Sequence, residues 1–374
     1  MNRHHAFVLS FLCGCFVPSP DVVVTDDDGG YEDPTARDVA AYDALAASLE
    51  ANRTQFLDEE ADELVAEDNW LFWLQFPGFD PTLHGYDSAS GARLDYAFPI
   101  GSGDEYNFRA SPELVVTAVR DGDEIIYSAY RAGSAMELVS QASFAAPSDE
   151  QRWYAYAVDH EVIYVMLVNS PEIPQKTLMR WQPGAAPQPV TTLESIDGEF
   201  WDFDVEGNTM LFIEGGRLWH LDLATKQAEW LENETEISGN VNFESDGVLF
   251  ESAAGPFFYR WPSRELVDIG AIIASSPYQL NATFPISHHY EEGLTRWGDY
   301  AIYIGYSGVF ALHLTTHDIA PVLLEPRSTS PRIEYRHPAV LDNGTLFVTG
   351  LTSESGSVGA DGPVYAVDLP SALP

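Results

Sequence analysis

The chain has 374 residues, of which 45% are hydrophobic and 13% aromatic, enough for a large core in one or two domains. Its 58 acidic and 18 basic residues give a formal net charge of −40, which repels both nucleic acid and anionic lipid headgroups, so nucleic-acid binding is excluded. Because the acidic residues are spread along the chain, they indicate a highly solvated surface suited to a saline habitat. A cation-binding or basic-partner surface is the alternative. The only two lysines, Lys176 and Lys226, are attributed to genome composition.

The first 14 residues have the layout of a signal peptide. Arg3 precedes the apolar run AFVLSFL at 6–12, which is too short to span a bilayer as a helix. The sequence Leu-Cys-Gly-Cys at 12–15 then resembles the lipobox of bacterial lipoproteins, with Cys13 a mild departure from it. This resemblance implies cleavage after residue 14 and lipid attachment to the sulfur of Cys15. A signal peptide cut elsewhere, with Cys15 incidental, is the alternative.

The resemblance also predicts a location. A lipidated Cys15 would anchor the protein to the membrane of the bacterial cell envelope, and Phe16 in place of aspartate directly after it favours the outer membrane over the inner one. Because Cys13 and Cys15 are the only cysteines, the mature domain is expected to contain neither disulfides nor cysteine metal sites.

Residues 15–33 are predicted to be an acidic, disordered tether, and residues 34–51 a helix. The tether contains prolines, glycines and the run Asp26–Asp28, which is interpreted as a charged linker in preference to a calcium site. The helix has Asp33 at its N-cap and Pro34 at its first position. It is expected to pack on the rim or at an end of the following domain.

Residues 201–231 show the unit from which the rest of the chain is built. Strands are expected at Trp201–Val205, Met210–Glu214, Arg217–Leu223 and Ala228–Leu231, because apolar and polar residues alternate between turns that contain glycine and asparagine. A single four-stranded meander cannot bury both of its faces. It therefore implies further copies to pack against.

Seven such units follow one another, each marked by a polar turn and then an apolar strand. The turns begin at Glu67, Asp121, Asp159, Glu206, Ser245, Trp297 and Asp342. Their average spacing of about 46 residues lies in the range of β-propellers. We therefore expect an all-β fold over residues 52–374, a seven-bladed β-propeller of four-stranded antiparallel blades, with one N-terminal helix.

Two details of this arrangement are specific. In the second unit, Glu113–Arg120 is predicted to be the first strand and Tyr127–Ala132 the third. The seventh unit has no fourth strand of its own, so Arg53–Leu57 (RTQFL) is predicted to supply it and to close the ring. A seventh blade that lacks its outer strand is the alternative.

The segment from His220 to Trp230 (HLDLATKQAEW) resembles the blade motif A-x-D-x-x-T-G-x-x-x-W of quinoprotein-like propellers, and the whole repeat resembles the quinoprotein-like and TolB-like repeats of bacterial envelope proteins. Asp222, Thr225 and Trp230 match the motif, whereas His220 and Lys226 depart from it. The resemblance implies that the tryptophan docks against the neighbouring blade. Trp219, Trp261 and Trp297 are likewise expected in the core. A monomeric propeller without a cofactor is expected.

Long loops at 76–83, 168–176, 275–292 and 351–362 are expected on one face of the propeller, which makes that face the predicted binding surface. Mere insertions are the alternative. The candidate binding residues in or beside these loops are Phe79, Asp80, His84, Glu172, His288, His289, Tyr290 and Glu291.

No metal site is predicted. His288 and His289 would point in opposite directions from one strand, and no third histidine follows at ligand spacing. Asp202-x-Asp204-x-Glu206 resembles the start of an EF-hand loop, but Ile213 stands where the bidentate glutamate is required, so an acidic β-turn is expected instead. The nucleophile elbow G-x-S-x-G, the P-loop and the motif H-E-x-x-H are absent from the sequence.

These observations favour a non-catalytic lipoprotein of the bacterial envelope whose propeller binds a protein, peptide or glycan partner through its long-loop face. The alternative is an enzyme, a carbohydrate-active hydrolase or lyase that uses carboxylates at the mouth of the propeller channel.

Overall fold

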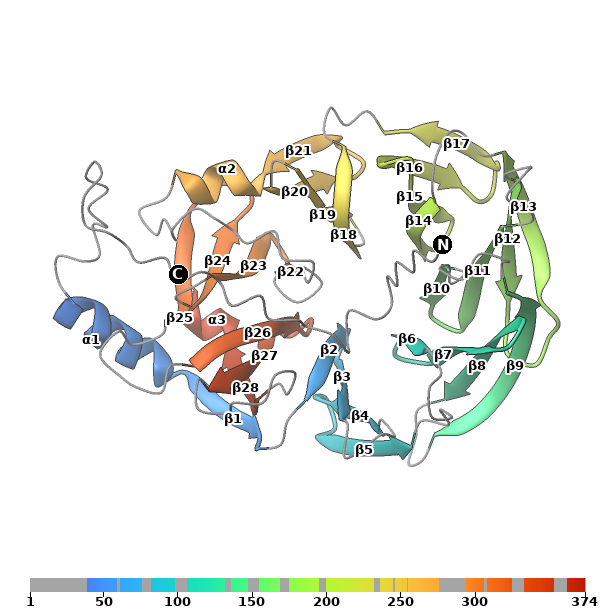
Figure 1. Cartoon of the computed structure of the whole chain (residues 1–374). Helices are drawn as coiled ribbons and strands as arrows, with labels where there is room; N and C mark the ends of the chain where they lie inside the picture. Colours follow the sequence, from blue (N-terminus) through green and yellow to red (C-terminus); the bar gives the residue numbers. More distant parts are fainter. Residues whose placement is uncertain are drawn as a thin grey trace, which may run out of the picture.

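The structure is a computed structural model that describes residues 39–58, 61–75, 82–97, 106–131, 136–146, 155–168, 175–194, 200–231, 236–244, 246–253, 255–275, 294–305, 308–324, 333–352 and 362–373. In this part of the chain, strands form seven four-stranded antiparallel sheets arranged radially around a central axis (Figure 1). The protein is therefore a seven-bladed β-propeller, as the sequence predicted.

In blades 1 to 6 the strands follow chain order from the channel outward, first to fourth. Blade 1 contains β2 (Asp62–Glu67), β3 (Trp70–Gln75), β4 (Thr82–Asp87) and β5 (Ala92–Ala97). Blade 2 contains β6 (Tyr106–Ala110), β7 (Val115–Asp121), β8 (Glu124–Arg131) and β9 (Glu137–Ala145). Blade 3 contains β10 (Tyr156–Asp159), β11 (Val162–Val168), β12 (Gln175–Trp181) and β13 (Gln188–Glu194). Blade 4 contains β14 (Phe200–Glu206), β15 (Thr209–Glu214), β16 (Arg217–Asp222) and β17 (Gln227–Trp230). Blade 5 contains β18 (Ile237–Glu244), β19 (Gly247–Ser252), β20 (Gly255–Arg260) and β21 (Glu265–Asp268). Blade 6 contains β22 (Leu294–Trp297), β23 (Tyr300–Gly305), β24 (Gly308–His313) and β25 (Ile319–Leu324).

Blade 7 is completed by the N-terminal strand. Its inner three strands are β26 (Ile333–Val340), β27 (Thr345–Thr352) and β28 (Val364–Asp368), and β1 (Arg53–Leu57) pairs antiparallel with β28. The closing strand predicted from RTQFL is therefore present, and the alternative of a blade without its outer strand is wrong. Closure of this kind leaves β28 with no open edge.

The core lies between the blades. In β3, Leu71 and Trp73 pack against blade 7, whereas Phe72 and Leu74 pack against blade 2. Because successive side chains of a strand point to opposite faces, an unbroken apolar run is what a blade buried on both faces requires. The same pattern recurs around the ring, where seven apolar clusters fill the seven interfaces between adjacent blades.

Blade 2 corrects one prediction. Glu113–Arg120 was expected to be its first strand, but the first strand is β6, and the second is β7. The turn at Gly122, with φ +59°, has the chemistry of a first turn but connects β7 to β8. The true first turn contains no glycine, and it is held by Ser111, whose Oγ accepts from the backbone N–H of Leu114 at 3.1 Å. The glycine signal therefore misplaced the strands.

Three short helices accompany the blades in the described residues. α1 (Val39–Glu50) lies within the predicted helix and packs through Ala46 and Leu49 on blade 6 beside β25, while Leu45 is exposed. α2 (Ile269–Ala274) and α3 (Leu369–Ala372) were not predicted. None of the described helices is long and apolar enough to cross a membrane.

Candidate functional site

The first strands of the blades form the inner ring, and acidic residues gather at one of its ends. β2, β6, β10, β14, β18, β22 and β26 surround the axis in Figure 1. The turns that connect first to second strands all lie at the same end, so residues near those turns converge on the axis. We call five of these residues the acidic mouth: Glu67, Asp68, Asp204, Glu244 and Asp342.

Glu67 has the most perturbed carboxyl group of the acidic mouth. It is accessible to solvent but enclosed by protein on most sides, and this loss of hydration raises its pKa to about 8. The charges of Asp204, Asp68, Glu244 and Asp342 raise its pKa further, in that order. No cation in the described part of the chain lowers the pKa of Glu67. Carboxylates from blades 1, 4, 5 and 7 therefore lie close enough to repel one another.

The pKa values of three further members of the acidic mouth are raised as well. Burial raises the pKa of Glu244 to about 7, although the charge of Arg296 lowers it. Burial raises the pKa of Asp204 to about 6, against the charge of Arg109. Burial, followed by the neighbouring Asp68, raises the pKa of Asp342. Because Glu67, Glu244 and Asp204 interact, these three groups titrate as a set near neutral pH.

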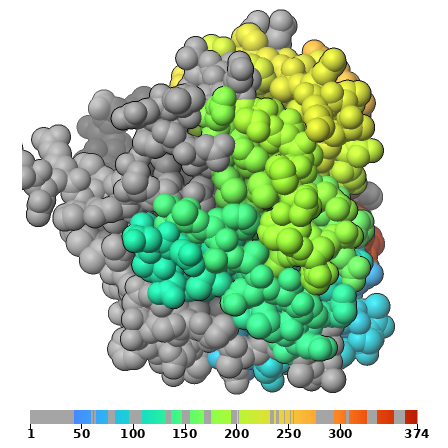
Figure 2. Space-filling model, turned by 90° about the vertical axis from the view of Figure 1, so that its right-hand side faces the viewer, coloured from blue at the N-terminus to red at the C-terminus, as the bar shows by residue number. Residues whose placement is uncertain are grey.

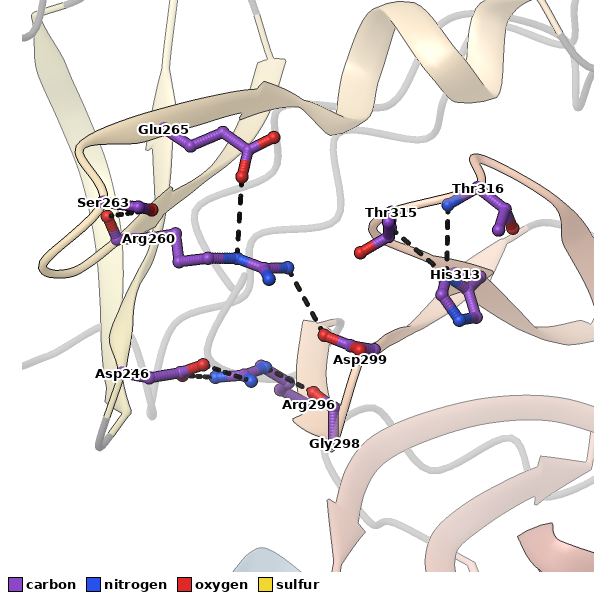
Figure 3. Close-up of polar contacts among 10 residues, drawn as sticks. All are labelled: Asp246, Arg260, Ser263, Glu265, Arg296, Gly298, Asp299, His313, Thr315 and Thr316. Atoms are coloured by element: carbon purple, nitrogen blue, oxygen red, sulfur yellow. Dashed lines mark hydrogen bonds and ion pairs between the residues drawn. The ribbon is translucent and has the colours of Figure 1, made fainter.

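The two arginines beside the acidic mouth are already paired with other carboxylates. The Nη2 of Arg109 in blade 2 lies 2.7 Å from Oδ2 of Asp202 in blade 4. Arg296 of blade 6 holds both carboxylate oxygens of Asp246 in blade 5 (Figure 3). These pairs connect blades around the channel, and they leave the acidic mouth short of positive charge.

Blades 5 and 6 are joined by a reciprocal set of arginines. While Arg296 crosses from blade 6 to blade 5, Arg260 crosses from blade 5 to Asp299 of blade 6, with Nη2 at 3.4 Å from Oδ1 (Figure 3). Both guanidinium groups lie over the ring of Phe258, at 4.9 Å for Arg296 and 5.8 Å for Arg260. This arrangement holds the turns of the two blades together beside the acidic mouth.

The chemistry available at the acidic mouth is that of crowded carboxyl groups. In the part of the chain that the structure describes, no three histidine, cysteine, aspartate or glutamate side chains lie together as metal ligands would. The groups can instead pair with an arginine or a lysine of a partner. They can also give or accept a proton near neutral pH.

The raised pKa values predict that the fold is more stable in mild acid than in base. The pKa of Glu67 is 4.5 in the unfolded chain and about 8 in the folded protein, so the native state retains protons that the unfolded state has lost. This stability is present below about pH 4 and is lost as the pH rises through about 6 to 8. After solvent screening, the change from about pH 5 to pH 8.5 should amount to about 2–4 kcal/mol in the free energy of unfolding.

Urea denaturation across this pH range checks the prediction. The double variant Glu67→Gln/Glu244→Gln should flatten the pH profile and be the more stable protein at the alkaline end. Its matched control, Glu124→Gln/Glu137→Gln, removes two exposed charges from blade 2 and should keep the wild-type slope. Equal slopes for both variants would assign the pH dependence to the overall charge and not to the acidic mouth.

Of the residues predicted to bind, His84 is the one in the described part of the chain. It lies in β4, beside one of the long loops, where its ring stacks on Trp73 at 5.2 Å and its Nδ1 is 2.6 Å from Asp95. Its side chain is therefore engaged within its own blade. The other predicted residues lie outside the described residues and stay predictions: Cys15, Phe79, Asp80, Glu172, His288, His289, Tyr290 and Glu291.

The segment that resembles an EF-hand lies mostly in a strand, in agreement with the strand predicted at Trp201–Val205. Asp202 and Asp204 belong to β14, and only Glu206 borders the acidic turn. The alternation of acidic residues with Phe203 and Val205, which are buried, was the sequence signal for an inner strand with an acidic face. The other members of the acidic mouth carry a similar signal, since each lies at or beside a predicted first turn.

The motif of blade 4 is used differently from what the family resemblance implies. Asp222 accepts hydrogen bonds from the backbone N–H groups of Ala224 at 2.8 Å and Thr225 at 3.0 Å, so it stabilises its own turn. Trp230 was expected in the core, but 40% of its surface is exposed, and Arg217 lies 4.6 Å from its ring centre. The expectation of a buried tryptophan is wrong at this position.

The fold and the channel thus define the class, a closed seven-bladed β-propeller that is acidic at one end of its axis. No protein-family model matches the sequence, and no curated protein matches it. Among solved structures, BamB from Moraxella catarrhalis is 14% identical over 81% of each chain, with a TM-score of 0.40.

A prolyl endopeptidase is 12% identical over 88% of this chain and 54% of its own, with a TM-score of 0.49. A chain of the mitotic checkpoint complex is 8% identical over 84% of this chain and 90% of its own, also at 0.49. Similarities at this level carry no argument about function, which has to come from the site.

Proposed function

We propose that this protein is a non-catalytic binding scaffold of the bacterial cell envelope. In this proposal Cys15 carries the lipid that anchors it, in the outer membrane by preference, and the propeller binds a protein, peptide or glycan partner. The support for the anchor is the lipobox-like sequence at 12–15. The long loops predicted on one face are one proposed surface for a partner, and the acidic mouth, at the end of the short first turns, is a second.

The acidic mouth is the single observation that supports the scaffold most directly. Glu67 is surrounded by four carboxylates, and the nearest arginines already hold Asp202 and Asp246. An entering cationic group would relieve this repulsion and lower the raised pKa values. The partner that fits is therefore a segment with arginine or lysine side chains, which docks at the short-turn end of the channel.

A labelled hexa-arginine peptide can test this binding by fluorescence anisotropy at about 0.15 M salt, where charges farther apart than about 8 Å are screened. Glu67→Gln/Glu244→Gln should weaken binding by about tenfold. The control Glu124→Gln/Glu137→Gln makes the same change in net charge on the outer part of blade 2 and should leave binding within about twofold. An equal loss of affinity in both variants would assign the binding to nonspecific electrostatic attraction and would contradict the proposal.

The anchor has its own test. In the native bacterial host, Cys15→Ser should move the protein from the membrane fraction to the soluble fraction, because no acylated sulfur remains to insert into the bilayer. Cys13→Ser is the matched control, since it alters a neighbouring cysteine and should leave the protein in the membrane fraction. If the Cys15→Ser protein still sediments with membranes, the lipoprotein proposal fails.

A hydrolase or lyase is the second candidate, favoured by one feature of the acidic mouth. The pKa of Glu67 at about 8 and that of Asp204 at about 6 would leave one group protonated and the other ionised near neutral pH. Such a difference suits a general acid and its partner carboxylate. Release of reducing ends from acidic or neutral polysaccharides, lost in Glu67→Gln, would support this candidate over the scaffold.

A further inference from the structure

The outer strands of the blades differ in how their open edges are protected. An outer strand exposes unpaired backbone N–H and C=O groups, which can pair with another strand. β25 is covered by α1 and contains Pro321, and β13 contains Pro189. β5 carries Arg93 and Asp95, while β1, β17 and β21 have only four or five residues each.

β9 has none of these protections in the described residues. It is the longest outer strand, with nine residues, and it contains neither a proline nor a charge after Glu137 at its start. Leu138 is the most exposed large apolar side chain described, at 52%. The side of the molecule that carries β9 faces the viewer in Figure 2. In a chain with a net charge of −40, this edge of nine residues carries a single charge, that of Glu137.

We propose that β9 is the contact surface for a second copy of this chain. Two β9 strands would pair antiparallel across a twofold axis and join two blades into one eight-stranded sheet. An edge strand is self-complementary under this symmetry, so the contact closes as a dimer. If the pairing is centred on Gln141, each Glu137 lies at an opposite end of the ladder, away from its counterpart.

The distribution of charge explains why a second copy of the chain would bind at β9 and not at another outer strand. A twofold contact through β17 or β21 would bring carboxylates of short strands together, whereas β9 offers nine residues with one carboxylate. The mutual repulsion of two chains that each carry a net charge of −40 opposes the dimer at low ionic strength. Because salt of about 1 M reduces the Debye length to about 3 Å, association through β9 should strengthen as salt is added.

The test is the oligomeric state of the full-length chain with Cys15→Ser, which removes association through lipid. Sedimentation velocity should show a monomer at about 0.05 M NaCl and a reversible dimer at about 1 M. Hydrogen exchange of the β9 amides should slow by about tenfold in the dimer. Gln141→Asp and Ser143→Asp place charge on exposed positions of the edge and should abolish both changes.

Two controls keep the result specific. Gln141→Thr alters the same exposed position without charge and should still dimerise. Gln227→Asp adds the same charge to the exposed outer strand β17 and should also dimerise. A Cys15→Ser chain with unaltered β9 that stays monomeric at every salt concentration would overturn the proposal. A dimer that persists in Gln141→Asp would overturn it as well, because the contact would then lie elsewhere.

Discussion

Replacing Lys176 by methionine should lower the free energy of unfolding by about 3–5 kcal/mol. Lys176 of blade 3 is 3% exposed, and its ammonium group pairs with Glu214 of blade 4, which is 2% exposed. The ring of Phe200 lies 5.3 Å from the same nitrogen. Removal of the lysine would leave a carboxylate without its ammonium partner at a site from which water is excluded. Urea denaturation followed by circular dichroism measures the loss.

The chain offers a matched control for this prediction. Lys226, the other lysine, is exposed in the turn after β16, so Lys226→Met should change stability by less than about 0.5 kcal/mol. The double variant Lys176→Met/Glu214→Leu removes both charges and should recover most of the loss, because a buried pair can be replaced by apolar groups at little net cost. A loss in Lys176→Met no larger than in Lys226→Met would show that the pair does not hold blades 3 and 4 together.

This pair also shows where prediction from the sequence stops. Lys176 was attributed to genome composition because lysine is rare in the chain, and nothing within its own strand singles this residue out. Its partner belongs to the next blade, 38 positions away, and the two meet only when the blades pack. Local periodicity predicts which residues face a neighbouring blade, but it does not predict which residue of that neighbour they contact.

The repeat itself was predictable for a local reason. In β15, Met210 and Phe212 face blade 3, whereas Leu211 and Ile213 face blade 5, and the turn at Gly207 has φ +58°. Both signals lie within a few residues of one another. Where a blade used a turn without glycine, as at Ser111, the same reasoning placed the strands wrongly.

Carboxylates at the channel mouth were named only as an alternative, and their individual residues were not predicted, because they come together only in the closed ring. Glu67 and Asp204 come from blades 1 and 4, and no spacing in the sequence links them. The available signal was that several repeats place an acidic residue at the first turn. Once these turns are known to share one end of the channel, their convergence follows.

Closure of the ring gives the second large expected effect, at Phe56. This residue of β1 lies between the last and first blades, with its ring centre 4.9 Å from Phe347 of blade 7 and 4.9 Å from Tyr86 of blade 1. The guanidinium of Arg93 lies 4.7 Å from the same ring. Phe56→Ala should therefore lower the free energy of unfolding by about 3 kcal/mol, since it removes half-buried aromatic contacts on both sides of the junction.

Thr54→Ala is the control on the same strand, because Thr54 is exposed and should contribute less than about 0.5 kcal/mol. Hydrogen exchange can then distinguish the loss of side-chain packing at position 56 from the loss of strand pairing between β1 and β28. If the junction opens, the amides of β28 should exchange faster in Phe56→Ala, while those of β15, on the far side of the ring, keep their wild-type rates. Unchanged exchange at β28 would mean that β1 stays paired without the aromatic contacts.

A disulfide between β1 and β28 distinguishes separation of β1 from the loss of aromatic packing alone. Thr54 lies opposite Ala366, so Thr54→Cys with Ala366→Cys, in a chain that lacks Cys13 and Cys15, can form a disulfide between β1 and β28. Because the link closes a loop that contains nearly the whole propeller, it should stabilise the fold by up to about 4–5 kcal/mol. If Phe56→Ala acts by letting β1 separate, the oxidised protein should lose little stability on that substitution, whereas the reduced protein should lose the full amount. Equal losses in both states would place the effect in local packing and leave the closure of the ring independent of Phe56.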